Sequence, residues 1–129
     1  VDSLGVGDPE AVAIGSYNIY NTLTAVTGAS DYVYNGRELY IIRNDSKFLP
    51  KITGSGCMAA SVIASFLTVE KDYALAAACA LALYCMAGEM AEGQGVKGPS
   101  DFRNKLIDTL YNLKTQDIVQ NIKIEKRQL

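Results

Sequence analysis

Histidine is missing from all 129 residues, and its absence rules out several kinds of active site. Ser-His-Asp and Cys-His catalysis need an imidazole base, and many zinc sites need an imidazole nitrogen as a ligand. The chain cannot build any of these sites from its own side chains.

Clustered positive charge is also missing. The 12 Lys and Arg residues are outnumbered by 14 Asp and Glu residues, and they are scattered except for Lys123, Lys126 and Arg127. Because a nucleic-acid-binding surface needs a basic patch, we expect no nucleic acid among the partners.

Long apolar runs are scarce as well. Residues 74–87 are rich in alanine and uncharged, but they are bounded by Asp72 and Glu89 and are too short to span a bilayer. No charged segment followed by an apolar one opens the chain, so we expect neither membrane insertion nor secretion.

Only three cysteines are present, Cys57, Cys79 and Cys85, and an odd number cannot pair completely within one chain. All three fall in apolar stretches with helical periodicity, which is typical of reduced thiols. This usage predicts a cytoplasmic location.

The chain is predicted to open with a helix and a buried strand. Asp8 as N-cap and Pro9 at the first helical position predict a helix over residues 8–20. Residues 22–27 are β-branched and aliphatic, and they predict a short strand that ends in a tight turn at Gly28.

A hairpin and a loop are predicted next. Two alternating runs flank the pair Asn35-Gly36, which is the strongest short-range signal for a type I′ turn. Residues 44–56 are rich in turn residues and contain Pro50, so we expect them to form a loop.

The rest of the chain is predicted to be mainly helical. Periodicity and turn signals indicate helices at roughly 56–69, 72–92 and 99–113, and the tail at 118–126 fits either a strand or a short helix. One buried strand and a hairpin make a small sheet for an α/β domain. We therefore expect further strands from sequence outside these residues or from a partner chain.

A glycine turn, Gly54-Ser55-Gly56-Cys57, stands at the start of the second predicted helix. Unpaired N–H groups and partial positive charge at a helix start suit a phosphate, and glycines let that phosphate approach the backbone. A packed turn with a buried structural cysteine fits the same spacing. The pattern is not a Walker A sequence, because no Gly-Lys-Ser/Thr follows. Spacing alone leaves both interpretations open.

Four blocks of the sequence, in the right order, resemble the C-terminal half of the hydroxyethylthiazole kinase family, which belongs to the ribokinase-like superfamily. The blocks are residues 25–36, 49–67, 82–91 and 97–113. The resemblance implies a three-layer α/β/α fold of ribokinase type, of which the chain supplies sheet strands, a β-hairpin and then consecutive helices. It also implies that residues 1–129 are the C-terminal part of one kinase domain whose N-terminal half is absent.

The activity that this resemblance implies is ATP-dependent phosphorylation of the hydroxyl of 4-methyl-5-(2-hydroxyethyl)thiazole in thiamine biosynthesis and salvage. Mg²⁺ would accompany the nucleotide, and no metal ligand is assigned within this chain. The resemblance also implies a homotrimer whose active sites lie between subunits. The expected partners are therefore the remaining half of the kinase and further copies of the same protein.

The resemblance also implies roles for individual residues. Gly54, Ser55 and Gly56 would form an anion hole for the migrating phosphoryl group, and the Gly54 backbone would also meet the thiazole. Cys57, where the superfamily usually carries Asp, would position the alcohol or accept its proton. Thr27 matches an ATP-contacting threonine, although a strand-end hydroxyl taken alone more often bonds its local backbone.

Three further residues are expected to be structural. Asp31 follows a small-residue turn and is expected to accept hydrogen bonds from its own loop. Cys79 and Cys85 lie on an alanine-rich stretch without neighbouring positive charge, so we expect them in helix contacts rather than in chemistry.

The chain departs from the family mainly in length, since a family member is about twice as long. The segments it lacks include the thiazole pocket, an Asn-x-x-Glu motif that organises Mg²⁺ and an arginine that contacts ATP. Ser55 and Ser100 replace residues more usual in the family, and neither change is expected to disable the site.

Two other functions stay open. The chain could be a non-catalytic phosphate- or nucleotide-binding module that keeps the glycine turn for stability. It could also belong to a kinase of a related alcohol, such as a hydroxymethylpyrimidine. Turnover of the thiazole alcohol separates these possibilities.

Overall fold

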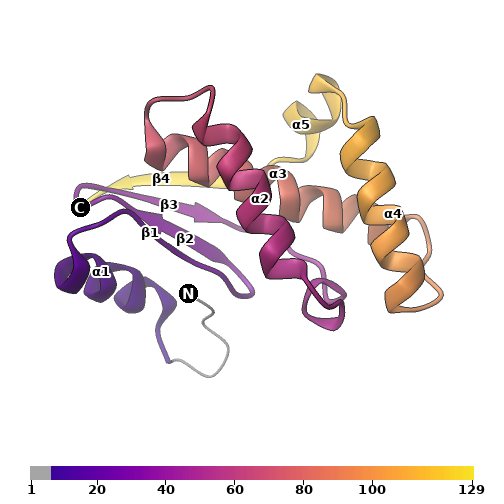
Figure 1. The fold of residues 1–129 in the computed structure, drawn as a ribbon, viewed down its shortest axis with the longest axis horizontal. Coiled ribbons are helices and arrows are strands. Elements are labelled where there is room, and N and C mark those ends of the chain that lie inside the picture. Colours follow the sequence, from indigo (N-terminus) through magenta and orange to yellow (C-terminus); the bar gives the residue numbers. More distant parts are fainter. Residues whose placement is uncertain (1–6) are drawn as a thin grey trace.

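The computed structural model describes residues 7–129, which form a mixed α/β structure around one sheet (Figure 1). The predicted order of strands, hairpin and consecutive helices is confirmed. The elements are, in chain order, α1 (Pro9–Tyr20), β1 (Thr24–Val26), β2 (Asp31–Tyr34), β3 (Glu38–Ile42), a 3₁₀ turn (Leu49–Lys51), α2 (Ser55–Leu67), α3 (Tyr73–Gly93), α4 (Pro99–Asn112), α5 (Thr115–Asn121) and β4 (Ile124–Gln128).

The sheet is built from strands of this chain. β1, β2, β3 and β4 are neighbours in that order, and every pairing is antiparallel. The strand at 22–27 therefore finds its partner within this chain, and the assumption that it would need outside strands to pair is wrong, while further strands from other sequence stay a prediction. β1 pairs with β2 across a short turn, and the tail contributes β4 after first forming α5.

The predicted hairpin is present, but its turn is not type I′. That turn needs positive φ at both central residues, whereas Gly36 has φ +91° and Asn35 lies outside the left-handed region. The Asn35 N–H bonds the carbonyl of Glu38, so Gly36 and Arg37 are the central residues, which is the type II′ pattern. A Cβ at position 36 would lie 2.5 Å from the Tyr17 ring, so packing also requires glycine there.

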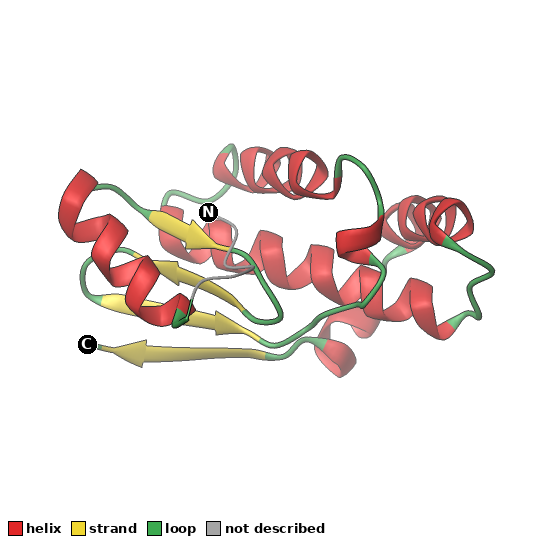
Figure 2. Ribbon diagram, turned by 90° about the horizontal axis from the view of Figure 1, so that it is seen from below, coloured by secondary structure: helices red, strands yellow, loops and turns green. Residues whose placement is uncertain are grey.

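A helix covers each face of the sheet. α1 packs on β1 and β2, and α3 packs on the opposite face of β2 and β3 (Figure 2). Alternation along β3 explains the two cores, because Leu39 and Ile41 join the α1 side while Tyr40 and Ile42 join the α3 side. α2 and α4 pack on α3, which makes α3 the central helix of the larger core.

The N-terminal helix begins at its predicted cap, and the edge strand carries the charges usual at a sheet edge. Asp8 is the N-cap of α1 as predicted, and its carboxylate accepts a hydrogen bond from the Glu10 N–H at 3.1 Å. β4 carries Glu125, Lys126 and Arg127, and charged side chains are usual on an edge strand because they discourage pairing with other chains.

α3 matches the predicted helix at 72–92 and extends beyond the uncharged stretch at 74–87, which alone is too short to span a bilayer. With 21 residues and a mean hydropathy of 1.6 over its most apolar window, the whole helix is long and apolar enough to cross a membrane by length and composition alone. However, 72% of that window is buried against the rest of the structure. This degree of burial is typical of a core helix, and α3 occupies that place in the larger core.

Candidate active site

A cleft of about 670 Å³ lies where β1 ends, between the β1–β2 turn, the segment at 45–52, the start of α2 and the middle of α3. Its walls bring together two parts of the chain that were singled out separately, Thr27 and the glycine turn at 54–56. The lining side chains that carry polar groups are Thr27, Asp31, Asp45, Ser46, Lys47, Ser55, Tyr84 and Cys85.

The glycine turn forms the first turn of α2. Gly54 is the N-cap with φ +85°, a conformation that favours glycine, and the first helical bond runs from the Met58 N–H to the Gly54 carbonyl at 2.9 Å. The N–H groups of Ser55, Gly56 and Cys57 therefore have no partner within the helix. A Cβ built at Gly54 or Gly56 would meet nothing within 4 Å, so an anion has room to approach.

Tyr84 ties the start of α2 to α3. Its hydroxyl donates to the Ser55 carbonyl at 3.0 Å and lies 3.2 Å from the Ser55 hydroxyl. Burial raises the pKa of Tyr84, against the opposing effect of the Ser55 hydrogen bond, so the phenol stays protonated and can donate at neutral pH.

The turn after β1 is tied to α3 through Asp31. One Asp31 carboxylate oxygen accepts from the Gly28 N–H at 2.9 Å, which confirms the expected local hydrogen bond. The other accepts from the Cys85 thiol at 3.2 Å, a contact that sequence reasoning missed. Burial is the main cause that raises the pKa of Asp31, and these two donors oppose it. Thr27 lies one residue before Gly28 and lines the cleft.

Cys57 stands apart from the cleft residues. It is exposed at the start of α2 and does not line the cleft, although its neighbours Ser55 and Gly56 do. Cys79 is half-buried, and burial raises the pKa of its thiol. Of the predicted site residues, the structure thus brings Thr27, Gly54, Ser55 and Gly56 together and leaves Cys57 outside the cleft lining.

Charge in the cleft is mixed. Lys47 is its one basic lining residue, and the ammonium lies 3.3 Å from a Glu92 carboxylate oxygen. Asp45 stands two residues earlier, and partial burial, more than the nearby Glu89 and Glu92, raises its pKa. Among residues 7–129, no group of three His, Cys, Asp or Glu side chains is placed to hold a metal ion.

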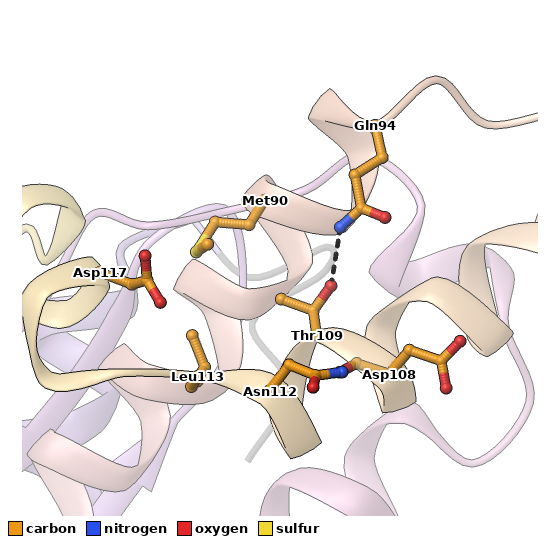
Figure 3. A pocket seen from close by; sticks show the side chains of 7 residues that line it. All are labelled: Met90, Gln94, Asp108, Thr109, Asn112, Leu113 and Asp117. Atoms are coloured by element: carbon orange, nitrogen blue, oxygen red, sulfur yellow. Dashed lines mark hydrogen bonds between the residues drawn. The ribbon is translucent and has the colours of Figure 1, made fainter.

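A second, smaller hollow of about 240 Å³ lies between the ends of α3 and α4 and the start of α5. Figure 3 shows the Gln94 amide donating to the Thr109 hydroxyl there, at 2.9 Å. Asp117 already accepts from the Lys114 N–H at the start of α5. This hollow contains none of the residues that the sequence analysis singled out, so the larger cleft is the candidate site.

The buried side-chain amide of Asn44 anchors the start of the segment at 45–52, which lines the cleft. The Asn44 side chain is 2% exposed and donates to Glu89 and to the Asn121 carbonyl, both at 2.9 Å. It accepts from the Lys123 N–H at 2.7 Å. Glu89 also accepts from the Asp45 N–H at 3.0 Å. The end of β3, the end of α3 and the tail are therefore joined at one point.

Replacing Glu89 with Gln should lower the free energy of unfolding by about 1.5 to 3 kcal/mol at pH 7. Burial raises the pKa of Glu89, but hydrogen bonds from Asp45, Lys123 and Asn44 outweigh burial and leave the pKa below its usual 4.5. A carboxyl with a lowered folded-state pKa contributes stability above the unfolded value and loses it as pH falls through the folded one. The difference between variant and wild type should therefore shrink below pH 4.5.

Urea unfolding at several pH values measures this effect. Glu125→Gln is the matched control, because its ion pair with Arg43 is about half exposed and should contribute less than about 1 kcal/mol. A Glu89→Gln difference that stays constant with pH would contradict the proposed role of the charge.

Comparison with known proteins gives a consistent result. A sequence profile of the hydroxyethylthiazole kinase family matches residues 9–116. The hydroxyethylthiazole kinase of Desulforudis audaxviator is 39% identical over 122 residues, which are 95% of this chain and 44% of that protein. The hydroxyethylthiazole kinase of Methanoculleus marisnigri is 40% identical over 128 residues, or 98% of this chain and 46% of that protein.

The fold gives the same relationship. The solved structure of a hydroxyethylthiazole kinase protein from Pyrococcus horikoshii superposes with a TM-score of 0.83 at 33% identity, over 90% of this chain and 45% of that one. The chain thus spans about half the length of the relatives it matches.

Proposed function

Because the chain belongs to the hydroxyethylthiazole kinase family, we propose that it forms part of an enzyme that phosphorylates the hydroxyl of 4-methyl-5-(2-hydroxyethyl)thiazole. ATP would supply the transferred phosphoryl group, and the product would enter thiamine biosynthesis and salvage. The observation that carries this proposal is the cleft in which Thr27 and the start of α2 line one space.

The first turn of α2 would bind the migrating phosphoryl group. Phosphoryl transfer through a loose transition state needs alignment and stabilisation of charge on the equatorial oxygens more than it needs a strong base. The unpaired N–H groups of Ser55, Gly56 and Cys57 provide fixed donors at the positive end of a helix. In this role Gly54, Ser55 and Gly56 are the anion hole, and glycine at 54 and 56 keeps side chains out of the way of the substrate.

Cys57 would orient the alcohol. Cys57 is exposed at the same helix start and directly follows the cleft-lining Gly56, so a substrate bound at this helix start would lie near its thiol. In this arrangement Cys57 holds the hydroxyl in line with the phosphoryl group, or accepts its proton, while the Gly54 backbone meets the thiazole. Because a loose transition state depends mainly on alignment, positioning the alcohol is the more important of these two roles for Cys57.

Thr27 would contact the nucleotide from the opposite wall. Its place just after β1 suits this role, because it lines the same cleft as the start of α2. The nucleotide phosphates fit the open helix start. Mg²⁺ would accompany the nucleotide, and no ligand for it is assigned among the described residues of this chain.

The rest of the site would come from further polypeptide. Since the chain spans about half the length of its relatives, we propose that residues 1–129 are the C-terminal part of one kinase domain and act together with the remaining half. We also propose that the complete enzyme is a cytoplasmic homotrimer. Native mass spectrometry of the complete enzyme tests the trimer.

The test of the proposed function is an assay on a family-length protein that contains this chain, supplied with ATP and Mg²⁺. We expect the thiazole alcohol to gain one phosphoryl group, detected by mass spectrometry. Preferential phosphorylation of a hydroxymethylpyrimidine would replace the thiazole by a related alcohol. Nucleotide binding without turnover of either alcohol would leave a binding module and refute the kinase proposal.

A further inference from the structure

The cleft has two walls from distant parts of the chain. One is the β1–β2 turn with Thr27 and Gly28, and the other is the first turn of α2 with Ser55 and Gly56. In the proposed reaction, the first wall contacts the nucleotide and the second contacts the migrating phosphoryl group. The distance between the two walls must therefore match a single bound nucleotide, and contacts within the fold must fix that distance.

Two consecutive residues of α3 make the contacts that do so. The Tyr84 hydroxyl donates to the Ser55 carbonyl at 3.0 Å, which holds the start of α2. The Cys85 thiol donates to Asp31 at 3.2 Å, and Asp31 accepts from the Gly28 N–H at 2.9 Å, which holds the turn after β1. Both links depart from adjacent positions on one helix.

Three of the residues that make these links are buried, and the helix that carries two of them is firmly packed. Asp31, Tyr84 and Cys85 are 3%, 2% and 6% exposed. α3 is itself the central helix of the larger core, packed by β2, β3, α2 and α4 (Figure 1). Buried hydrogen bonds to a packed helix restrict movement far more than exposed ones do.

The thiol is suited to its part. Burial, reinforced by the neighbouring Asp31 carboxylate, raises the pKa of Cys85 far above its usual value, so Cys85 keeps its proton. It therefore acts as a hydrogen-bond donor. Both carboxylate oxygens of Asp31 are engaged, one on each side of the link.

We propose that Tyr84 and Cys85, acting through Ser55 and Asp31, are positioning residues that set the separation between the nucleotide wall and the phosphoryl wall of the cleft. This inference rests on the proposed function and adds to it a device that the predicted site residues do not contain. We call this pair of links the α3 brace.

Kinetics on the family-length kinase test the α3 brace. Tyr84→Phe loosens the phosphoryl wall and should lower kcat about tenfold with little change in the KM for ATP. Cys85→Ala loosens the nucleotide wall and should raise that KM about three- to tenfold with little change in kcat. Cys85→Ser restores a donor and should recover the wild-type KM. Cys79→Ala, on the same helix but outside the cleft, is the matched control.

The double variant separates a brace from two independent hydrogen bonds. If one lost link already leaves the separation undefined, the second loss should reduce kcat/KM by less than it does alone. Effects that multiply fully, or a Cys85→Ala KM that Cys85→Ser does not rescue, would overturn the proposal.

A readout without catalysis tests the brace even if the proposed kinase activity is absent. In the family-length protein, Cys85→Ala should accelerate amide hydrogen exchange at Gly28, and Tyr84→Phe should accelerate it at Met58, whose N–H bonds the Gly54 carbonyl. Unchanged exchange at both amides would refute the brace by itself. If exchange accelerates as expected but no thiazole is phosphorylated, only the proposed function is refuted.

Discussion

Replacing Gly56 with Pro should lower kcat for phosphoryl transfer by about 10²- to 10³-fold, the usual loss when one preorganised backbone or side-chain donor is removed from an anion hole. Gly56 is the second residue of α2, so its N–H has no helical partner and is free to donate to a substrate anion. Proline is tolerated in the first helical turn, so the substitution removes the donor while the helix remains.

Two variants give this experiment its controls. Gly56→Ala keeps the N–H but adds a Cβ in the space left for the substrate, so the further loss in Gly56→Pro relative to Gly56→Ala measures the missing donor rather than the added bulk. Cys57→Ala removes the thiol but keeps all the amides, and it should lose less activity than Gly56→Pro. Steady-state kinetics give kcat, and circular dichroism checks the helix. A larger loss in Cys57→Ala would assign the main catalytic role to the thiol instead.

Replacing Phe102 with Ala should lower the free energy of unfolding by about 3 to 5 kcal/mol, because a fully buried aromatic side chain leaves a cavity. Phe102 is 0% exposed, and its ring stacks on Phe48 with centroids 5.4 Å apart. Phe48 belongs to the segment at 45–52, most of which lines the cleft. The loss should therefore also loosen that segment.

Chemical denaturation measures the change for Phe102→Ala. Tyr111→Ala is the matched control, since Tyr111 lies on the same helix but is 88% exposed, and its loss should change stability by less than about 0.5 kcal/mol. Equal effects in the two variants would mean that α4 does not depend on the Phe48 contact.

The helices could be predicted because their ends are encoded locally. Asp8 with Pro9 begins α1, and Pro99 begins α4, as expected from capping chemistry. Periodicity then gave the extents of α2 and α3 to within a few residues. Capping and periodicity act over three or four positions, so a single sequence is enough to predict the helices.

The arrangement of the sheet could not be predicted in the same way. Strand β4 reads as a polar segment, because an edge strand buries little, and its partner β3 is far away in the sequence. The hairpin was predicted correctly, but not its turn. The turn lies one residue later than predicted, at Gly36 and Arg37, where Tyr17 packs so closely on Gly36 that a Cβ would clash, a tertiary contact that the local sequence does not reveal.

The candidate site was only partly visible in the sequence. Thr27 and the glycine turn carried recognisable patterns, and the structure places them on one cleft. The links from Tyr84 to Ser55 and from Cys85 to Asp31 join residues 29 and 54 positions apart, so no spacing rule reveals them. Cys85 was predicted as a helix-contact residue, and its bond to a buried carboxylate gives it a more specific structural role.

The order of the strands also has a consequence for synthesis and folding. β1, β2 and β3 are joined by short turns, whereas the pairing of β3 with β4 joins residues 82 to 90 positions apart. Closing so large a loop is slow, and β4 is translated after every other described element. Until β4 docks, the outer edge of β3 offers unpaired backbone groups to neighbouring chains, so the interval before docking is when the nascent protein is most prone to aggregate.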